Sequence, residues 1–417
     1  MQIIFDLDGT LFQTKYCVIN AINRLFDAFG IMRAEEQYIT QNIGKKTEDF
    51  LSSLLPSSIN IQDASVLFRE LEQNEVKENG ILFSDITEML ENLFTKGHSL
   101  SICSNGSLEY IELVLNRTKI REYFCEIYSA KHYASKAEAV KSIIKRNPSA
   151  VMIGDTFSDI DAAKRNRIPS IGVAYGYGNK EDQSKATFIA ENANDIIPCL
   201  SQIEVFHHIT QKLINRGKRI LGINGVDTSG KTLFTHNFSR YLDSIGIHNT
   251  ILHIDDFHNP SEIRYRGENE IDAYYKNAFN YNQIINDILK PLLSDGYIDK
   301  NIPCLNLDTD QYDKHIHFNI RSDTILLIEG VLLFREPLSE YLEGKIFLHI
   351  NFDEVINRAR MRDVPKYGIA FLQKYKDKYI PIQKMYLSEH APEQKSDIVI
   401  DNNDYLNPVI MRDTGMA

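Results

Sequence analysis

The chain has 417 residues, of which 43% are hydrophobic and 25% are charged, and its formal net charge is −11. This length favours two or three domains, each large enough to bury its own core, and the composition excludes a disordered or fibrous chain. The acidic balance argues against a nucleic-acid partner, because proteins that grip a phosphate backbone are usually basic.

Targeting and redox features are inconspicuous. No apolar run is long enough to span a bilayer, and residues 1–10 lack the charged and apolar regions of a signal peptide. The five cysteines are scattered without the paired spacing of a metal site, which is typical of reduced thiols. We therefore expect a cytoplasmic protein with no membrane partner.

Short apolar runs that end in acidic or small residues recur along the chain, with amphipathic segments between them. In chain order the runs are IIFDLD, LSICSN, AVMIGD, SIGVA, RILGIN, TILHIDD, TILLIEG, KIFLHI and DIVIDN. This alternation predicts an α/β protein with two doubly wound parallel-sheet domains. Ligands of such sheets bind at the carboxyl ends of the strands, so the polar residues that close the runs are candidates for chemistry.

The runs form two series, and each series opens with its own phosphate-binding signature. A helical stretch at about residues 201–215 precedes the second series, and we place the boundary between domains 1–203 and 204–417. Residues 14–80 form a mostly helical insertion that the first sheet does not need.

The first signature is Asp6-Leu7-Asp8-Gly9-Thr10, directly after a predicted strand. If the strand continued, its alternation would place Asp6 and Asp8 on the same side. One carboxylate of such a pair can attack phosphorus while the other handles a proton. An anionic nucleophile approaches an anionic phosphate only with a divalent metal, and an all-oxygen site suits Mg²⁺.

Later strand ends supply the other parts of a phosphoryl-transfer site. Ser104 and Asn105 offer donors for the phosphoryl oxygens, and Lys136 precedes an amphipathic helix as a neutralising cation. Asp155 and Asp159 add carboxylates for the metal. Such fixed donors and cations stabilise the charge that spreads over the phosphoryl oxygens.

This set of motifs, over residues 1–200, resembles the haloacid dehalogenase superfamily, specifically its phosphoglycolate-phosphatase-like branch. The resemblance implies that Asp6 is the nucleophile and Asp8 the general acid/base, with both in the metal site. It also implies that Ser104 and Lys136 bind phosphate. The insertion at about residues 14–80 would be a helical cap that excludes water and selects small substrates. Gly44-Lys45-Lys46-Thr47 is either a substrate contact in that cap or part of its solvated surface.

The second signature, residues 225–232, has the pattern G-x-x-x-x-G-K-[ST] between a predicted strand and a predicted helix. Its backbone N–H groups are expected to wrap the β- and γ-phosphates of ATP, with Lys231 as the cation and Thr232 as a Mg²⁺ ligand. The phosphate-binding residues predicted in this loop are Gly225, Asp227, Ser229, Gly230, Lys231 and Thr232.

Polar residues at the following strand ends favour a kinase. Asp255 and Asp256 close one run, and a carboxylate there can accept the proton of an attacking hydroxyl. Glu329 closes another run and is suited to hold Mg²⁺. Arg358, Arg360 and Arg362 follow, and at helical spacing they span more than one face. We expect one or two of them, with Arg358 and Arg362 as the candidates, to fold over the phosphates.

These features, over residues 203–408, resemble the uridine kinase-like branch of the P-loop kinases. The resemblance implies that Asp255 is the first candidate for the catalytic base and Asp256 the second. Residues 303–317 depart from the pyrimidine-contacting segment of uridine kinases. We interpret Tyr274 and Tyr275 as packing residues. The run Lys374–Lys378 is expected to be a solvated helix face.

Three hypotheses remain open at this point. The first is a bifunctional enzyme that is both a Mg²⁺-dependent phosphomonoester phosphatase and an ATP-dependent kinase of a small, nucleoside-like substrate. The second is a polynucleotide 5′-kinase/3′-phosphatase, since such enzymes also join a phosphatase of this superfamily to a P-loop kinase. The third is that one of the two domains is a non-catalytic ligand-sensing module.

Overall fold

The computed structural model of the chain describes residues 1–43, 45, 47–147 and 149–414. The chain divides into two compact units, Met1–Leu200 and Ser201–Ala417, and helix α10 (Ile196–Lys212) runs across this division. Each unit contains a predominantly parallel sheet with helices, which confirms the predicted fold class. None of the helices in the described ranges has the length and apolar character that a membrane span requires.

The sheet of the first unit contains six parallel strands in the order β3-β2-β1-β4-β5-β6. The strands are β1 (Gln2–Phe5), β2 (Ser99–Ser104), β3 (Phe124–Ser129), β4 (Ala150–Gly154), β5 (Ser170–Val173) and β6 (Phe188–Ala190). The runs of β1 and β4 are buried on both faces, as expected for a covered parallel sheet. Because the strand order reverses at β1 and β4, their carboxyl ends border the crevice where such sheets bind ligands.

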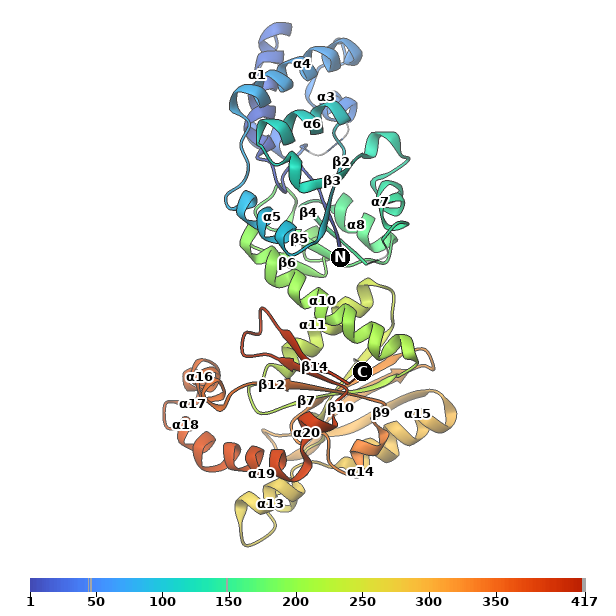
Figure 1. Ribbon diagram of the computed structural model, residues 1–417, viewed down its shortest axis with the longest axis vertical. Coiled ribbons are helices and arrows are strands. Elements are labelled where there is room, and N and C mark those ends of the chain that lie inside the picture. Colours follow the sequence, from blue (N-terminus) through green and yellow to red (C-terminus); the bar gives the residue numbers. More distant parts are fainter. Residues whose placement is uncertain (44, 46, 148, 415–417) are drawn as a thin grey trace. The chain divides into compact units, whose positions relative to one another are not determined.

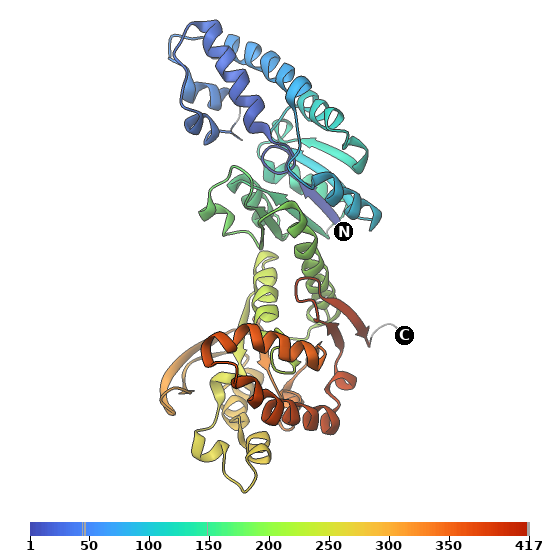
Figure 2. The same cartoon turned by 90° about the vertical axis from the view of Figure 1, so that its left-hand side faces the viewer.

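The helices of the first unit form two groups. The first group contains α1 (Thr14–Phe29), α2 (Glu36–Thr40), α3 (Thr47–Leu54) and α4 (Ile61–Asn79). These helices pack on one another (Figures 1 and 2) around a core of their own that includes Leu25, Phe50 and Phe68. The second group covers the sheet and contains α5 (Ile86–Thr95), α6 (Leu108–Arg117), α7 (Lys136–Ile144), α8 (Phe157–Arg165) and α9 (Lys180–Gln183).

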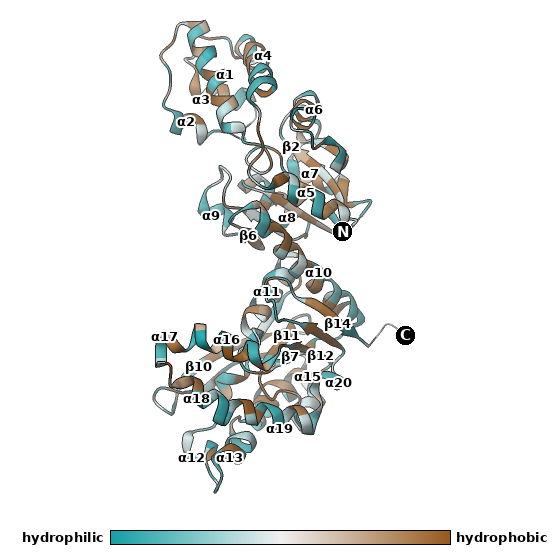
Figure 3. Ribbon diagram, turned by 60° about the vertical axis from the view of Figure 1, so that its left-hand side comes forward, coloured by the Kyte–Doolittle hydropathy of each residue, from teal (hydrophilic) through white to brown (hydrophobic). Residues whose placement is uncertain are grey.

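The sheet of the second unit has the order β14-β13-β12-β7-β11-β8, with only β14 antiparallel. The strands are β7 (Ile220–Gly225), β8 (Asn249–His253), β11 (Ile325–Gly330), β12 (Gly344–His349), β13 (Ile398–Asp401) and β14 (Val409–Asp413). The central strands are the hydrophobic part of this unit (Figure 3), and β7 and β11 are buried along their whole length. An antiparallel hairpin, β9 (Ile298–Asn306) and β10 (Gln311–Ile320), forms a separate two-stranded sheet.

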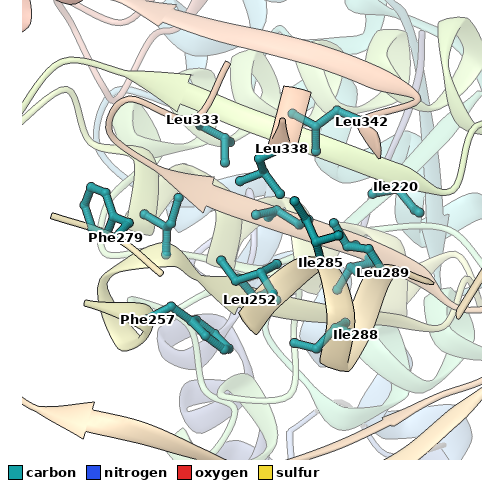
Figure 4. Packing of buried hydrophobic residues seen from close by; sticks show 14 of the residues in the cluster. Ile220, Leu252, Phe257, Phe279, Ile285, Ile288, Leu289, Leu333, Leu338 and Leu342 are labelled. Atoms are coloured by element: carbon teal, nitrogen blue, oxygen red, sulfur yellow. The ribbon is translucent and has the colours of Figure 1, made fainter. Parts of the chain in front are cut away.

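Helices surround the second sheet. They are α11 (Lys231–Ser244), α12 (Ser261–Arg264), α13 (Glu270–Asn277), α14 (Tyr281–Ile284), α15 (Lys290–Asp295), α16 (Phe352–Arg362), α17 (Val364–Tyr367), α18 (Phe371–Lys374), α19 (Ile380–His390) and α20 (Pro392–Lys395). Helices α14 and α15 are joined by a π-helical turn, Ile285–Leu289. This segment packs Ile285, Ile288 and Leu289 against the sheet residues Ile220 and Leu252 (Figure 4).

Candidate active sites

The Asp6–Thr10 segment turns sharply away from the sheet after β1. Gly9 makes this turn possible with φ of +81°, in the left-handed region that favours glycine. A Cβ atom on Gly9 would lie 2.4 Å from Oδ2 of Asp155. Glycine therefore allows the end of β1 to pack directly against the carboxylate that follows β4.

Three predicted carboxylates come together at this edge of the first sheet. Asp6, Asp155 and Asp159 are buried, and one oxygen of each lies within 4.8 Å of the others. Nζ of Lys136 lies 2.7 Å from Oδ1 of Asp6 and 2.5 Å from Oδ1 of Asp159. Lys136 is only 5% exposed, so the ion pairs form away from water, where charge interactions are strong.

Helix N-termini hold two of these side chains in place. Ser135 caps α7 by accepting a hydrogen bond from the N–H of Glu138, which places Lys136 at the first helical position. Asp159 belongs to a capping box at the start of α8, where its Oδ2 accepts from the N–H and the hydroxyl of Thr156. The other oxygen of Asp159, Oδ1, is therefore available for the ion pair with Lys136.

This cluster contains more acidic than basic side chains. Burial, and then the neighbouring Asp159, raise the pKa of Asp6 well above its usual value and the pKa of Asp155 to about 7. Burial opposes the charge of Lys136, but Asp159 and Asp6 still hold its pKa above the ordinary lysine value. Three buried carboxylates that face a single ammonium group fit a divalent cation with oxygen ligands such as Mg²⁺.

A glycine-containing turn supports Asp155 from its other side. Oδ2 of Asp155 accepts hydrogen bonds from the backbone N–H groups of Tyr177, at 2.7 Å, and Gly178, at 3.2 Å. A Cβ atom on Gly176 would lie 2.3 Å from Cβ of Asp155, and one on Gly178 would lie 1.7 Å from its carbonyl oxygen. The Tyr175–Gly178 segment therefore fixes the orientation of the Asp155 carboxylate.

The side chain of Asp8 is not part of the carboxylate group. Its Oδ1 accepts hydrogen bonds from the hydroxyls of Thr14, at 2.6 Å, and Tyr110, at 2.8 Å, and its Oδ2 lies 3.4 Å from the hydroxyl of Ser104. The alternation argument does not apply here, because β1 ends at Phe5. Burial raises the pKa of Asp8, while these hydrogen bonds lower it. Sequence reasoning missed Tyr110, which no local pattern connects with Asp8.

A cavity of about 90 Å³ lies beside Asp8, between the helical insertion and the sheet domain. Asn105 and Lys45 are among its lining residues, and Nζ of Lys45 also donates to Asn42. Glu72 lines it too, and burial and then Asp8 raise the pKa of Glu72 to about 8. Gly44 and Lys46 of the predicted cap contact lie outside the described residues.

The phosphate-binding loop of the second unit connects β7 to α11, as its pattern predicts. Gly230 has φ of +86° immediately before the helix begins at Lys231. Nζ of Lys231 donates to the carbonyl of Val226 at 2.8 Å and lies 3.4 Å from Oγ of Ser229. The N-terminus of α11 and the lysine are thus both directed at the loop, which is the arrangement that binds phosphate.

Thr232 and Glu329 meet although they are far apart in the sequence. The hydroxyl of Thr232 donates to Oε1 of Glu329 at 3.0 Å. Nδ1 of His253, the last residue of β8, lies 2.6 Å from the same oxygen. Burial raises the pKa of Glu329, but the hydrogen bond from His253 and the charge of Lys231 leave it below the usual value. An ionised carboxylate beside a threonine hydroxyl fits the oxygen ligands of Mg²⁺; His253 was not identified from the sequence.

The two aspartates that follow β8 differ in their surroundings. Oδ1 of Asp256 forms an ion pair of 2.6 Å with Nζ of Lys314 from the hairpin. The carboxylate of Asp255 is exposed, and within the described residues it has no hydrogen bond or ion pair. Asp255 lies close enough to Lys231 to influence its pKa. Asp255 is therefore the aspartate that remains accessible to a substrate.

The three predicted arginines of α16 have different neighbours. Arg358 donates to the carbonyl of Thr228 in the phosphate-binding loop and to the carbonyls of Asn402 and Asn403. Arg358 and Arg362 line a cavity of about 280 Å³ together with Lys231, Thr232 and Tyr405, among others. The exposed Arg360 does not line it.

Two further interpretations of the second unit have different outcomes. Tyr275 is buried and Tyr274 packs against the same hydrophobic core, in agreement with a packing role; Tyr274 also lies near Asp227 and Asp255, which raise its pKa in addition to burial. Lys378 is not solvated as predicted: it is 7% exposed, forms an ion pair with Glu270 and lies over the ring of Tyr274. The prediction failed because α13 covers this side of the π-helical turn Tyr375–Tyr379.

Comparisons with protein families match each unit separately. Residues 3–173 match the family of haloacid dehalogenase-like hydrolases. Residues 220–396 match the phosphoribulokinase/uridine kinase family.

Known proteins resemble the units in the same way. A phosphoglycolate phosphatase of Vibrio parahaemolyticus is 24% identical over 213 residues, covering 47% of this chain and 93% of that protein. A phosphoglycolate phosphatase of Colwellia psychrerythraea is 28% identical over 196 residues, covering 43% of this chain and 87% of that protein. The solved structure of a possible uridine kinase from Bacillus stearothermophilus covers 48% of this chain and 96% of its own, with 22% identity and a TM-score of 0.38. The chain is therefore a haloacid dehalogenase-like phosphatase domain fused to a uridine kinase-like domain.

Proposed function

We propose that the chain is a bifunctional enzyme that hydrolyses a small phosphomonoester in its first unit and phosphorylates a small hydroxyl-bearing acceptor with ATP in its second. The observation that carries the first activity is the buried cluster of three carboxylates bridged by Lys136. The second activity is supported by the loop at Lys231 with Thr232 and Glu329 beside it.

In the phosphatase, an oxygen of Asp6 attacks phosphorus and the bond between phosphorus and the ester oxygen breaks. Asp8 gives its proton to the leaving oxygen, and burial, which raises the pKa of Asp8, favours the protonated form that this role requires. Water then attacks the aspartyl phosphate, Asp8 takes the proton, and Asp6 is released. Lys136 and Ser104 bind phosphoryl oxygens. Mg²⁺, held by Asp6, Asp155 and Asp159, would supply positive charge to the phosphoryl group.

In the kinase, Asp255 accepts the proton of the acceptor hydroxyl as that oxygen attacks the γ-phosphorus of ATP and the bond to the β,γ-bridging oxygen breaks. Asp256 is bound to Lys314 and serves to hold the hairpin rather than to take the proton. Lys231 neutralises the phosphates, and Arg358 and Arg362 approach them from α16. Thr232 and Glu329 would hold the Mg²⁺ that accompanies ATP.

A screen of the purified full chain tests both activities. Phosphate release from a panel of phosphomonoesters, with Mg²⁺ or with EDTA, measures the first, and mass-spectrometric detection of phosphorylated acceptors with ATP measures the second. The panel includes an oligonucleotide with a 5′-hydroxyl and a 3′-phosphate, and its preferential turnover would indicate nucleic-acid end repair instead. If no phosphomonoester were hydrolysed and no acceptor phosphorylated, the proposed function would be wrong.

A further inference from the structure

The cavity beside Asp8 contains a carboxyl group that takes no part in the proposed reaction. Glu72 of α4 lines this cavity together with Asp8. In the described part of the chain the carboxyl group of Glu72 has no hydrogen bond and no ion pair. Asp8 differs, because its Oδ1 accepts hydrogen bonds from the hydroxyls of Thr14 and Tyr110. Glu72 is therefore a carboxyl group in this cavity that remains available to a ligand.

The place of Asp8 decides which part of a substrate the cavity can receive. In the proposed reaction Asp8 gives its proton to the leaving oxygen, so the alcohol part of the phosphomonoester extends from Asp8 into the cavity. Asp6 and Lys136, which act on the phosphoryl group, are not among the described residues that line it. Its volume of about 90 Å³ is far smaller than that of sites for drug-sized ligands. The cavity therefore suits a short alcohol.

Three basic side chains also line the cavity, but they do not neutralise Glu72. Lys45, Arg69 and Lys131 are all exposed, where water and salt weaken their charges. Arg69 and Lys131 lower the pKa of Glu72, yet burial and the charge of Asp8 have larger effects and raise it to about 8. The neighbouring charge that acts most strongly on Glu72 is thus the negative charge of Asp8. A cationic group between the two carboxyl groups would be attracted to both.

Aromatic rings form another part of the wall. Phe50 and Phe68, whose ring centroids lie 5.8 Å apart, line the cavity together with Tyr110. The face of an aromatic ring attracts a cation, and aromatic rings around a site are a known means of binding alkylammonium groups. A carboxylate on the ligand would gain nothing from these rings and would be repelled by Glu72. The wall therefore favours an ammonium group.

We propose that the phosphatase acts on a phosphomonoester whose short alcohol carries an amino group, and that Glu72 binds the ammonium form of this group. The assignment rests on the proposed phosphatase function and names its substrate class, an aminoalkyl phosphate. Glu72 is a specificity-determining residue, because it contacts the alcohol part and not the reacting phosphorus. Phosphoglycolate, which the names of the similar phosphatases contain, carries a carboxylate on its alcohol part and should be the poorer substrate.

Three substrates of nearly equal size test the assignment. O-phosphoethanolamine, ethylene glycol monophosphate and phosphoglycolate end in an ammonium, a hydroxyl and a carboxylate group. Phosphate release by the full chain with Mg²⁺ near neutral pH gives kcat/KM for each. We expect kcat/KM for O-phosphoethanolamine to exceed that for phosphoglycolate by about tenfold to a hundredfold, the worth of a hydrogen bond between charged groups. Ethylene glycol monophosphate should lie between them.

Substitutions of Glu72 connect this order with the side chain. Glu72→Gln should remove most of the preference, mainly through a higher KM for O-phosphoethanolamine, and Glu72→Lys should reverse the order in favour of phosphoglycolate. Glu70→Gln, at an exposed position of the same helix, is the matched control and should preserve the wild-type order.

The failure of this assignment can be distinguished from the failure of the phosphatase function. Equal hydrolysis of the three substrates by the wild-type chain, a wild-type preference for phosphoglycolate, or a preference for O-phosphoethanolamine that survives Glu72→Gln would overturn the assignment while the phosphatase activity stands. If the wild-type chain hydrolysed none of them, and p-nitrophenyl phosphate was not hydrolysed either, the proposed phosphatase function would fail, and this assignment with it.

Discussion

The ammonium group of Lys136 lies 2.7 Å from Asp6 and, at the same time, 2.5 Å from Asp159. One buried cation thus joins the proposed nucleophile to a proposed metal ligand. Removing it would leave the three clustered carboxylates, Asp155 included, without an ion-pair partner among the residues that the structure describes.

The first prediction concerns this lysine. Lys136→Met should lower kcat of the phosphatase about 10²- to 10³-fold, because a fixed positive group that stabilises the transition state is lost. It should also destabilise the first unit in EDTA by about 3–5 kcal/mol, the cost of breaking a buried pair. Thermal unfolding with and without Mg²⁺ measures this, and Mg²⁺ should restore part of the loss.

Lys141→Met, on the exposed face of the same helix α7, is the control. It should change neither kcat nor the melting temperature appreciably. A Lys136→Met protein with wild-type kcat would show that the lysine has no part in phosphoryl transfer.

The second prediction distinguishes the two aspartates after β8. Asp255→Asn should lower kcat of the kinase about 10²- to 10⁴-fold, since the proton acceptor is removed. Asp256→Asn should have a much smaller effect, because its partly exposed ion pair with Lys314 is worth only about 0.2–1 kcal/mol. Steady-state kinetics of both variants test this order, and a larger loss in Asp256→Asn would assign the base to Asp256.

The third prediction compares two arginines of α16. Arg358→Ala should raise the KM for ATP about tenfold, because Arg358 ties the phosphate-binding loop to residues 402 and 403 through charged hydrogen bonds. Arg360→Ala should leave this KM unchanged. Equal effects of the two substitutions would contradict the different placement of these side chains.

The sequence motifs could predict those candidate site residues that directly follow a predicted strand or begin a predicted helix. Asp6, Asp155 and Lys231 lie at strand ends or helix starts that the local pattern defines, and parallel strands bring such ends to one edge. The sequence could also predict both folds, because buried runs such as those of β1 and β7 are visible without knowledge of contacts.

Other parts of the sites depend on contacts between distant segments. Tyr110 contacts Asp8 from α6, His253 contacts Glu329 from the neighbouring strand β8, and Gln383 contacts Asp227 from a helix more than 150 residues away in the sequence. No periodic pattern in the sequence indicates these contacts. The prediction that Lys378 is solvated failed for the same reason, because Tyr274 of α13, distant in the sequence, lies against it.

The fourth prediction concerns pH. Burial and Asp8 raise the pKa of Glu72 from 4.5 to about 8. Below pH 4.5 the folded and unfolded chains both carry this proton. As the pH rises toward 8 the unfolded chain loses it first, so the carboxyl group lowers the stability of the fold increasingly, until both states are ionised above pH 8.

Glu72→Gln should therefore raise the melting temperature of the first unit at pH 8–9, by about 2–4 °C for each kcal/mol gained, and leave it unchanged near pH 4. Calorimetry over this pH range provides the measurement. Glu70→Gln, at an exposed position of the same helix α4, is the control. A stabilisation that is equal at both pH values would contradict the raised pKa.

The most direct test of two separate phosphoryl-transfer sites is to assay both activities in two single variants of the full chain. Asp6→Asn should abolish phosphate release from the phosphomonoester and leave phosphorylation of the acceptor by ATP at the wild-type rate. Lys231→Ala should do the reverse. If Asp6→Asn left phosphate release unchanged, or if either substitution abolished both activities in a folded protein, the account of two independent catalytic units would be wrong.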